Sequence, residues 1–214
     1  MAEDRQCDQC GGAFTPRREH ARFCSAACRV AWNQEHRRDL ATGPGALDWS
    51  VAALADLTPR LAALAAAGRG QAAAVVGEAV WQVTIVDATL VRYHHEVYDA
   101  VLACQPAGDR QVTEGTMAGL RFVRNHLART PGRDSLIGPP PGGTDGADGT
   151  WTWQPVTRPA ADALRSRGRA WELSRYHAYQ QFLAGHPVAA ILDRAARFVC
   201  LTAARLPAVT DVSA

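Results

Sequence analysis

Apolar residues recur at helical intervals over most of the chain beyond residue 46. The longest periodic segment, Gln71–Cys104, places valine and leucine at steps that sum to seven residues. The positions that form this stripe are Val76, Val80, Val83, Leu90, Val97 and Val101. Because an α-helix repeats about every 3.6 residues, such a stripe stays on one face, which is buried against a core or a partner. The segment therefore predicts one long helix.

Breaker residues divide the rest of this region into further helices. Leu47–Ala67 is rich in Ala and Leu, and Pro59 is typical of a first helical turn, so we expect two short helices there. Further helices are expected near Asp109–Arg129 and Pro159–Ala184, and a last one opens at Pro187. The pattern predicts a mainly α fold with a body of about six helices.

Composition and charge narrow the classes of partner. The chain has 214 residues, of which 47% are hydrophobic, enough to bury a core without disulfides. Its formal net charge is only +2, so DNA, RNA or an anionic surface would have to meet a local patch. Met1–Arg5 holds two acids and no apolar run, and charged residues or Pro59 interrupt the later apolar stretches. We therefore expect a cytoplasmic chain that does not span a membrane.

Four of the six cysteines lie within the first 28 residues. Cys7 and Cys10 form a C-x2-C pair followed by two glycines, and Cys24 and Cys28 form a C-x3-C pair. A tight turn and one helical turn each direct two sulfurs to one centre, and four thiolates suit a closed tetrahedral zinc site. We expect one structural Zn²⁺ ion. The other cysteines fall in apolar helical patterns, where we expect small buried side chains; they are Cys104 and Cys200.

The run CDQCGGAFTPRREHARFCSAACRVAWN resembles the small treble-clef zinc fingers of the MYM, FCS and TRASH type. In these fingers a Phe follows the first cysteine pair, here Phe14, and an aromatic residue, Cys and Ser open the second, here Phe23, Cys24 and Ser25. The resemblance covers residues 5–38. It implies a zinc finger of a kind that serves nucleic-acid binding, protein docking or metal sensing.

The finger also predicts local structure. We expect two short strands, Ala13–Thr15 and Ala21–Phe23, around a polar turn at Pro16–His20. A helix over Ser25–Leu40 follows. The expected organisation of the whole chain is a finger at residues 1–41, a linker at 42–46, a first helical part at 47–130, a Gly/Pro-rich loop at 131–150, a second helical part at 151–207 and a tail at 208–214.

Within the second helical part, Trp151 and Trp153 alternate with threonines. This alternation predicts a short extended piece with both indoles on one surface. The two indoles either anchor the preceding loop to the core or stack nucleobases.

Two groups of arginines are candidates for phosphate contacts with DNA or RNA, because the guanidinium is a planar, permanently charged fork. Acids between them leave a solvated charged face as the alternative. The first group, in the finger, is Arg17, Arg18 and Arg22, and the second, on the helix after residue 159, is Arg165, Arg167 and Arg169.

Three polar side chains fall on apolar helix faces. Asp87 and His94 lie on the long valine stripe, and Arg124 lies in the apolar arc of Asp109–Arg129. A buried polar group without a partner costs roughly 1–3 kcal/mol, so each needs one. We expect Arg124 to pair with Asp87 or Glu96. Asp87 and His94 are either structural hydrogen-bonding groups or part of a polar site.

The run from Leu120 to His126 is similar to helix ends of the HEPN ribonucleases, all-α dimers that cleave RNA without metal. The resemblance implies that His126 would act in acid–base chemistry and that Arg121, or Arg124 with Asn125, would contact phosphate. Arg121 and His126 have the family's spacing, but Phe122 stands where a polar residue belongs. If Arg124 and Asn125 are aligned with the family motif instead, Arg129 occupies the place of the His. In a straight helix Arg121 and His126 also point about 140° apart.

Three functions therefore stay open. The first is a zinc-stabilised binding protein that contacts nucleic acid or a protein through the finger and the arginine-rich faces. The second is a HEPN-like, metal-independent ribonuclease of a toxin or antiphage system. The third is a non-catalytic interaction module whose body forms a homodimer through the valine stripe.

Overall fold

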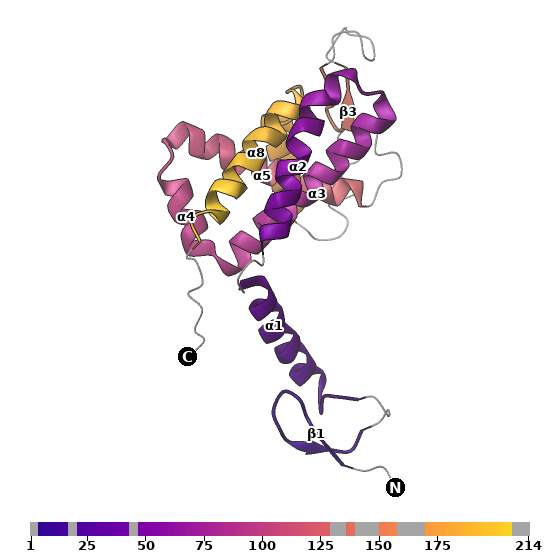
Figure 1. The fold of residues 1–214 in the computed structure, drawn as a ribbon, viewed down its shortest axis with the longest axis vertical. Helices are drawn as coiled ribbons and strands as arrows, with labels where there is room; N and C mark the ends of the chain where they lie inside the picture. The colour runs from indigo at the N-terminus through magenta and orange to yellow at the C-terminus, as the bar shows by residue number, and fades with distance from the viewer. Residues whose placement is uncertain are drawn as a thin grey trace. The chain divides into compact units, whose positions relative to one another are not determined.

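A computed structural model describes residues 4–16, 21–42, 47–128, 136–139, 150–157 and 170–206. The chain divides into two compact units, one formed by residues 1–46 with 208–214 and the other by residues 47–207 (Figure 1). The prediction of a mainly helical fold with an N-terminal four-cysteine cluster is confirmed.

The N-terminal unit starts with a small antiparallel pair of strands. Strand β1 (Arg5–Gln6) pairs with β2 (Ala13–Phe14), so that Arg5 lies opposite Phe14 and Gln6 opposite Ala13. Helix α1 (Ala26–Thr42) follows. Ser25 begins this helix, because its hydroxyl oxygen accepts a hydrogen bond from the backbone N–H of Cys28 at 3.1 Å.

The strand partner expected for Ala13–Thr15 is wrong. β2 pairs with β1, which precedes the first cysteine pair, and Ala21–Phe23 forms no strand. Among the described residues, the carbonyl oxygen of Arg22 in that segment accepts a backbone hydrogen bond from the N–H of Asp8 at 3.0 Å. The sequence signal favoured the wrong segment because β1 is polar and only two residues long, so it carries no alternation of its own.

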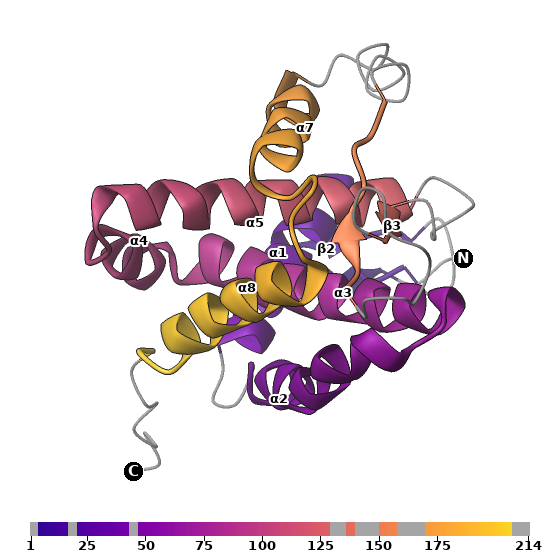
Figure 2. The ribbon, with the colours of Figure 1, turned by 90° about the horizontal axis from the view of Figure 1, so that it is seen from above.

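The body consists of six described α-helices and one 3₁₀ turn. Helix α3 lies between α2 and α5 and also packs against α8 (Figure 2). The elements are α2 (Asp48–Ala62), η1 (Ala63–Ala66), α3 (Arg69–Tyr93), α4 (His95–Ala103), α5 (Ala107–Leu127), α7 (Ala170–Phe182) and α8 (Val188–Ala203).

The long valine stripe forms the centre of this body. Five of its six members are buried and Val97 packs partly buried against the same core. The stripe therefore contacts α2, α5 and α8 of the same chain. This excludes it as the surface of a homodimer, the role that the third function gave it.

Two helix boundaries differ from the sequence expectations. Pro59 lies inside α2, which continues without a break where two short helices were expected. The segment Gln71–Cys104 is not one helix, because the backbone leaves helical geometry at His94, with φ −135° and ψ 34°. His94 is accordingly only partly buried and does not lie on the buried face of α3.

Part of the expected loop 131–150 is ordered against the body. Strand β3 (Ile137–Gly138) pairs antiparallel with β4 (Thr152–Trp153). Trp153 in β4 and Trp151 just before it are both buried, and Nε1 of Trp151 donates to the carbonyl oxygen of Leu64 at 2.8 Å. The indoles therefore anchor this segment to the core. The rest of the expected loop lies outside the described residues.

Two glycines let α5 and α7 approach closely. A Cβ at Gly115 would overlap the ring of Phe182, and one at Gly119 would lie 2.6 Å from Cδ1 of Leu183. Gly185, with φ +80°, then reverses the chain between α7 and α8. Of the two cysteines expected to be buried in the body, Cys200 is partly buried, but Cys104 is exposed because it follows the end of α4.

Candidate metal centre

The four N-terminal cysteines converge on one point. One sulfur from each of Cys7, Cys10, Cys24 and Cys28 lies within 4.8 Å of all the others. Two of the Sγ–Sγ distances are 3.7 Å, between Cys10 and Cys24, and 3.5 Å, between Cys24 and Cys28. All four are free thiols, not disulfides.

The first two ligands come from a tight turn. The backbone N–H of Cys7 donates to the carbonyl oxygen of Gly12 at 2.9 Å, and the N–H of Gly11 donates back to the carbonyl oxygen of Cys7 at 2.8 Å. Gly11 adopts φ +68°, a left-handed conformation that a side chain disfavours. The glycine after the C-x2-C pair is thus what lets the turn close behind the two sulfurs.

The other two ligands flank the start of α1. Cys24 precedes the capping residue Ser25, and Cys28 lies in the first turn of the helix. The backbone N–H of Cys24 also points to Sγ of Cys7 at 3.4 Å. Helix initiation therefore fixes the second pair against the first, and backbone N–H groups meet the sulfur that would carry negative charge.

Crowding of the sulfurs affects their protonation. Hydrogen bonds with three neighbouring cysteines raise the pKa of the Cys24 thiol to about 12, and the largest contribution comes from Cys28. At Cys7, burial raises the pKa, but backbone N–H groups of Cys24, Cys10 and Gln9 outweigh it and lower the pKa to about 6. Four thiolates cannot share this small space without a cation to neutralise them.

The donor set and the spacing fit a tetrahedral metal ion. With metal–sulfur bonds of about 2.3 Å, the edges of a sulfur tetrahedron are about 3.8 Å long, close to the two measured Sγ–Sγ distances. Thiolates are ligands for soft or borderline ions, zinc among them. The site is therefore positioned to hold a metal ion and is compatible with zinc.

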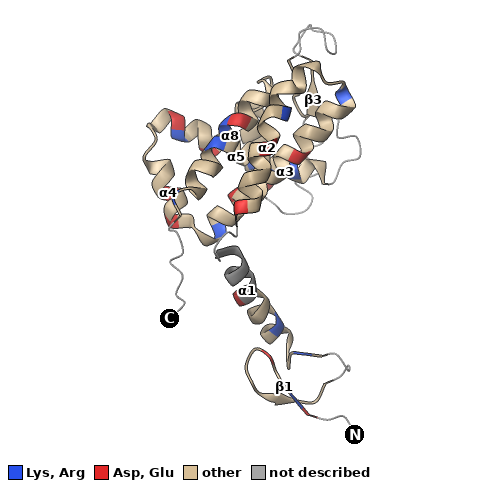
Figure 3. Cartoon of the chain, in the orientation of Figure 1, with Lys and Arg blue, Asp and Glu red and all other residues tan. Residues whose placement is uncertain are grey.

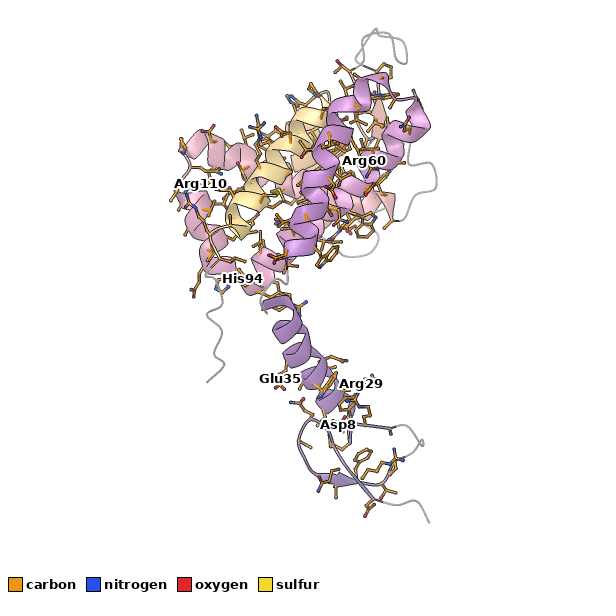
Figure 4. All side chains as sticks on the ribbon, in the orientation of Figure 1. Asp8, Arg29, Glu35, Arg60, His94 and Arg110 are labelled. Atoms are coloured by element: carbon orange, nitrogen blue, oxygen red, sulfur yellow. The ribbon has the colours of Figure 1, made fainter. Side chains whose placement is uncertain are left out.

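Side chains around the cysteines brace the turn against α1. Nε2 of Gln9 donates to Glu35 at 2.9 Å, and the ring centroids of Phe23 and Trp32 lie 5.7 Å apart. Asp8, Arg29 and Glu35 mark the two braced segments in Figure 4. Because α1 supplies Cys28, Trp32 and Glu35, the same helix positions a ligand and carries the contacts that hold the other ligands in place.

Of the finger arginines expected to bind phosphate, only Arg22 is described, and it has protein partners. Its Nε lies 2.6 Å from a carboxylate oxygen of Asp8, and its guanidinium lies 4.8 Å from the ring centroid of Trp32. The other expected phosphate contacts lie outside the described residues; they are Arg17, Arg18, Arg165, Arg167 and Arg169. Acids and arginines are interspersed along the described helices (Figure 3).

A second polar cluster lies in the core of the body. Asp87 is fully buried and pairs with Arg121, whose Nε and Nη2 lie 2.6 and 2.8 Å from the two carboxylate oxygens. The hydroxyl of Tyr98 donates to the same carboxylate at 2.9 Å. Burial raises the pKa of Tyr98, so this hydroxyl keeps its proton. The break at His94 folds α4 back and brings Tyr98 to Asp87.

Arg121, and not Arg124, is thus the partner of Asp87. Arg124 is partly buried, and its Nη2 lies 3.3 Å from the side-chain oxygen of Asn125. Periodicity places Arg124 inside the apolar arc of α5 and Arg121 about 60° from it around the helix, so periodicity alone favours the wrong arginine. Tyr98 was absent from the expected site, although its place among polar residues between Val97 and Val101 was a signal.

The residues of the HEPN resemblance are not brought together as the family requires. Arg121 and His126 lie five residues apart on the uninterrupted helix α5. The side chain of Arg121 pairs with Asp87, whereas the ring of His126 stacks on Phe122 with ring centroids 5.8 Å apart. Burial lowers the pKa of His126, so its neutral form is favoured.

One described helix, α3, is long and apolar enough to cross a membrane by length and composition. Half of its apolar window is buried inside the body, and the core helix of a soluble protein passes the same length and composition test. Asp87, fully buried and ion-paired, lies on the same helix.

The comparisons add no relative. No family model, no curated protein and no solved structure matches the chain.

Proposed function

We propose that the chain is a zinc-stabilised binding protein whose N-terminal finger contacts nucleic acid or a protein partner. The observation that supports this proposal is the convergence of four cysteine sulfurs within 4.8 Å of one another. A zinc ion held there by Cys7, Cys10, Cys24 and Cys28 supplies folding energy to a segment with almost no core.

A binding role fits this site better than catalysis. Hydrolytic zinc keeps an open position for water, whereas four thiolates fill a tetrahedral shell. The ribonuclease alternative is not part of the proposal, because Arg121 is occupied by Asp87.

The finger presents charges of both signs. Its exposed side chains include three arginines and three acids: Arg5, Arg22, Arg29, Asp4, Asp8 and Glu35. This balance does not favour DNA or RNA by bulk attraction, so a phosphate contact would depend on few side chains. Salt dependence separates the two partner classes, because phosphate contacts weaken steeply as salt rises.

The test measures metal and binding on the same protein. The zinc-loaded full chain and Cys24→Ser are compared for zinc per chain and for anisotropy shifts of labelled duplex DNA and structured RNA over a salt series. Cys104→Ser, which changes an exposed cysteine outside the site, is the matched control. We expect about one zinc per chain in the parent and control and a loss in Cys24→Ser.

The outcomes separate the parts of the proposal. Equal zinc content in Cys24→Ser would contradict the four-thiolate site. A salt-sensitive shift that Cys24→Ser abolishes supports nucleic-acid binding by the finger. If zinc is bound and the anisotropy of DNA and RNA does not shift at any salt concentration, nucleic-acid binding is contradicted and a protein partner remains.

A further inference from the structure

The face of α3 that points away from the core carries a regular stripe. Its members follow one another at steps of three, four, three and four residues, so they lie within about 100° of the helix circumference. We call this set the outer α3 stripe; it consists of Glu78, Trp81, Ile85, Ala88 and Arg92. Alternating steps of three and four residues are those by which one helix meets another in a coiled coil.

The outer α3 stripe is open to solvent. Trp81 is 46% exposed, Ile85 is partly exposed, and the other three members are exposed. Beside Trp81 the surface is hollowed by about 430 Å³, between α3 and the end of α5 at Leu127. A second indole, Trp49 on the neighbouring helix α2, is 60% exposed. Aromatic side chains are enriched at the centres of interfaces relative to the rest of a protein surface.

We propose that a second copy of this chain covers the outer α3 stripe, with the two α3 helices antiparallel about a two-fold axis through Ile85. Residue numbers opposite one another across such an axis sum to about 170. Ile85 therefore meets its own copy, and Trp81 meets the small side chain of Ala88 from the second copy. A large residue opposite a small one is how facing helices interdigitate.

Charge complementarity specifies this orientation. The same axis places Glu78 opposite Arg92 of the second copy, and Arg92 opposite Glu78 of the second copy, at the two ends of the contact. Oε2 of Glu78 already lies 2.7 Å from Nη2 of Arg60 on α2. Its other carboxylate oxygen still has lone pairs to accept a second guanidinium. A parallel arrangement would instead place like charges opposite one another at both ends.

The size of the contact sets its strength. The stripe extends from Glu78 to Arg92, about 21 Å along the helix axis. A contact of this length falls short of the standard interface of about 800 Å² per partner, so we expect a dissociation constant in the micromolar range. The chain would then change from monomer to dimer within concentrations accessible to sedimentation.

Sedimentation velocity of the zinc-loaded full chain, from about 1 to 200 µM, tests this proposal. We expect reversible dimerisation that Trp81→Ala weakens about tenfold or more. Glu78→Arg and Arg92→Glu should each weaken it, and the double variant should restore it, because the exchanged charges again face one another. Helical circular dichroism of each variant confirms that the monomer is folded. Leu201→Ala, which removes an equally exposed side chain on α8, is the matched control.

Restoration by the double variant is the decisive support, since loss of the Arg60 contact cannot explain it. A chain that stays monomeric up to the highest concentration overturns the proposal. Dimerisation that is equal in Trp81→Ala and the parent also overturns it, because another face is then responsible. In the last measurement, binding of the chain to vesicles of phosphatidylcholine with phosphatidylglycerol is tested. A monomer that binds them through Trp81 assigns the face to lipid and overturns the dimer.

Discussion

The finger and the helical body of this chain are held together by different forces. Among the described hydrophobic residues that are buried, Cys7 alone belongs to the N-terminal unit, and all others belong to the body. In the finger, Phe14, Phe23 and Trp32 are only partly buried. The body instead encloses large side chains such as Trp153 and Tyr179 completely.

This difference shows how one chain folds two regions of unequal size. A segment of about 40 residues buries too little apolar surface to fold without a metal or disulfides. The body has helices on several sides of α3 and needs no such support. The finger is therefore expected to depend on its metal site and the body on packing and on its buried polar cluster.

Metal removal is the largest test of this contrast. We expect a chelator, or Cys24→Ser, to unfold the finger and leave the body helical, because binding of structural zinc supplies about 10–16 kcal/mol in zinc-finger peptides. Limited proteolysis followed by mass spectrometry measures this. Cleavage should appear within residues 5–38 only after metal loss, while α2 to α8 stay protected.

Restoring the ion provides the control. Added zinc should return protection to the parent chain but not to Cys24→Ser. If the body lost its helical signal together with the finger, the two units would not be stabilised independently and the comparison would fail.

Asp87→Ala is the corresponding test of what stabilises the body. It removes the carboxylate that holds Arg121 and Tyr98, and leaves a guanidinium that is only a quarter exposed without its partner. Removal of one member of a buried pair costs about 3–5 kcal/mol, and the partial exposure of Arg121 favours the lower end of this range. Urea denaturation followed by helical circular dichroism measures the loss.

Asp193→Ala is the matched control for this variant. Asp193 pairs with Arg197 at 2.6 Å on the exposed surface of α8, where an ion pair contributes about 0–1 kcal/mol. Zinc content should stay unchanged in both variants. Equal destabilisation of the two would show that burial of the Asp87 cluster adds nothing to its strength.

Much of the architecture could be predicted because its signals are local. The cysteine spacing placed the sulfurs, since a C-x2-C turn and one helical turn leave little freedom. The valine stripe predicted which face of α3 is buried. The partner of Asp87 could not be predicted, because periodicity placed Arg124 in the apolar arc, whereas the packing of α3 against α5 brings Arg121, about 60° away around the helix, to Asp87.

The helix break at His94 escaped prediction for a similar reason. The stripe continues through Val97 and Val101 in the same sevenfold steps, so the sequence shows no interruption. In a straight helix, Tyr98 would lie about 16 Å along the axis from Asp87. The 2.9 Å hydrogen bond between them exists only because the chain turns at His94. Tertiary contacts formed by α4 thus override the periodic pattern.

Packing inside the body is tested by a pair of glycine substitutions. Gly119→Ala would place a methyl group 2.6 Å from Leu183 and 3.2 Å from the backbone of Tyr179. Overpacking of this kind costs about 1–3 kcal/mol. Gly77→Ala is the matched control, because nothing lies within 4 Å of its Cβ and alanine favours a helix by about 1 kcal/mol over glycine. Thermal unfolding should shift in opposite directions for the two variants.

The smallest expected effect is a pH dependence confined to the body. Burial lowers the pKa of His126 below its ordinary value near 6.5, so the folded state disfavours the proton that the unfolded chain accepts. The stabilising contribution of the neutral ring is fully present above the unfolded pKa and is lost as pH falls through the folded pKa. The parent should therefore lose stability more steeply than His126→Gln as pH falls below about 7. Thiolate protonation weakens metal binding equally in both proteins, so the difference between their urea midpoints isolates the body. Identical pH profiles would mean that the ring, although stacked on Phe122, is solvated enough to take up its proton in the folded chain.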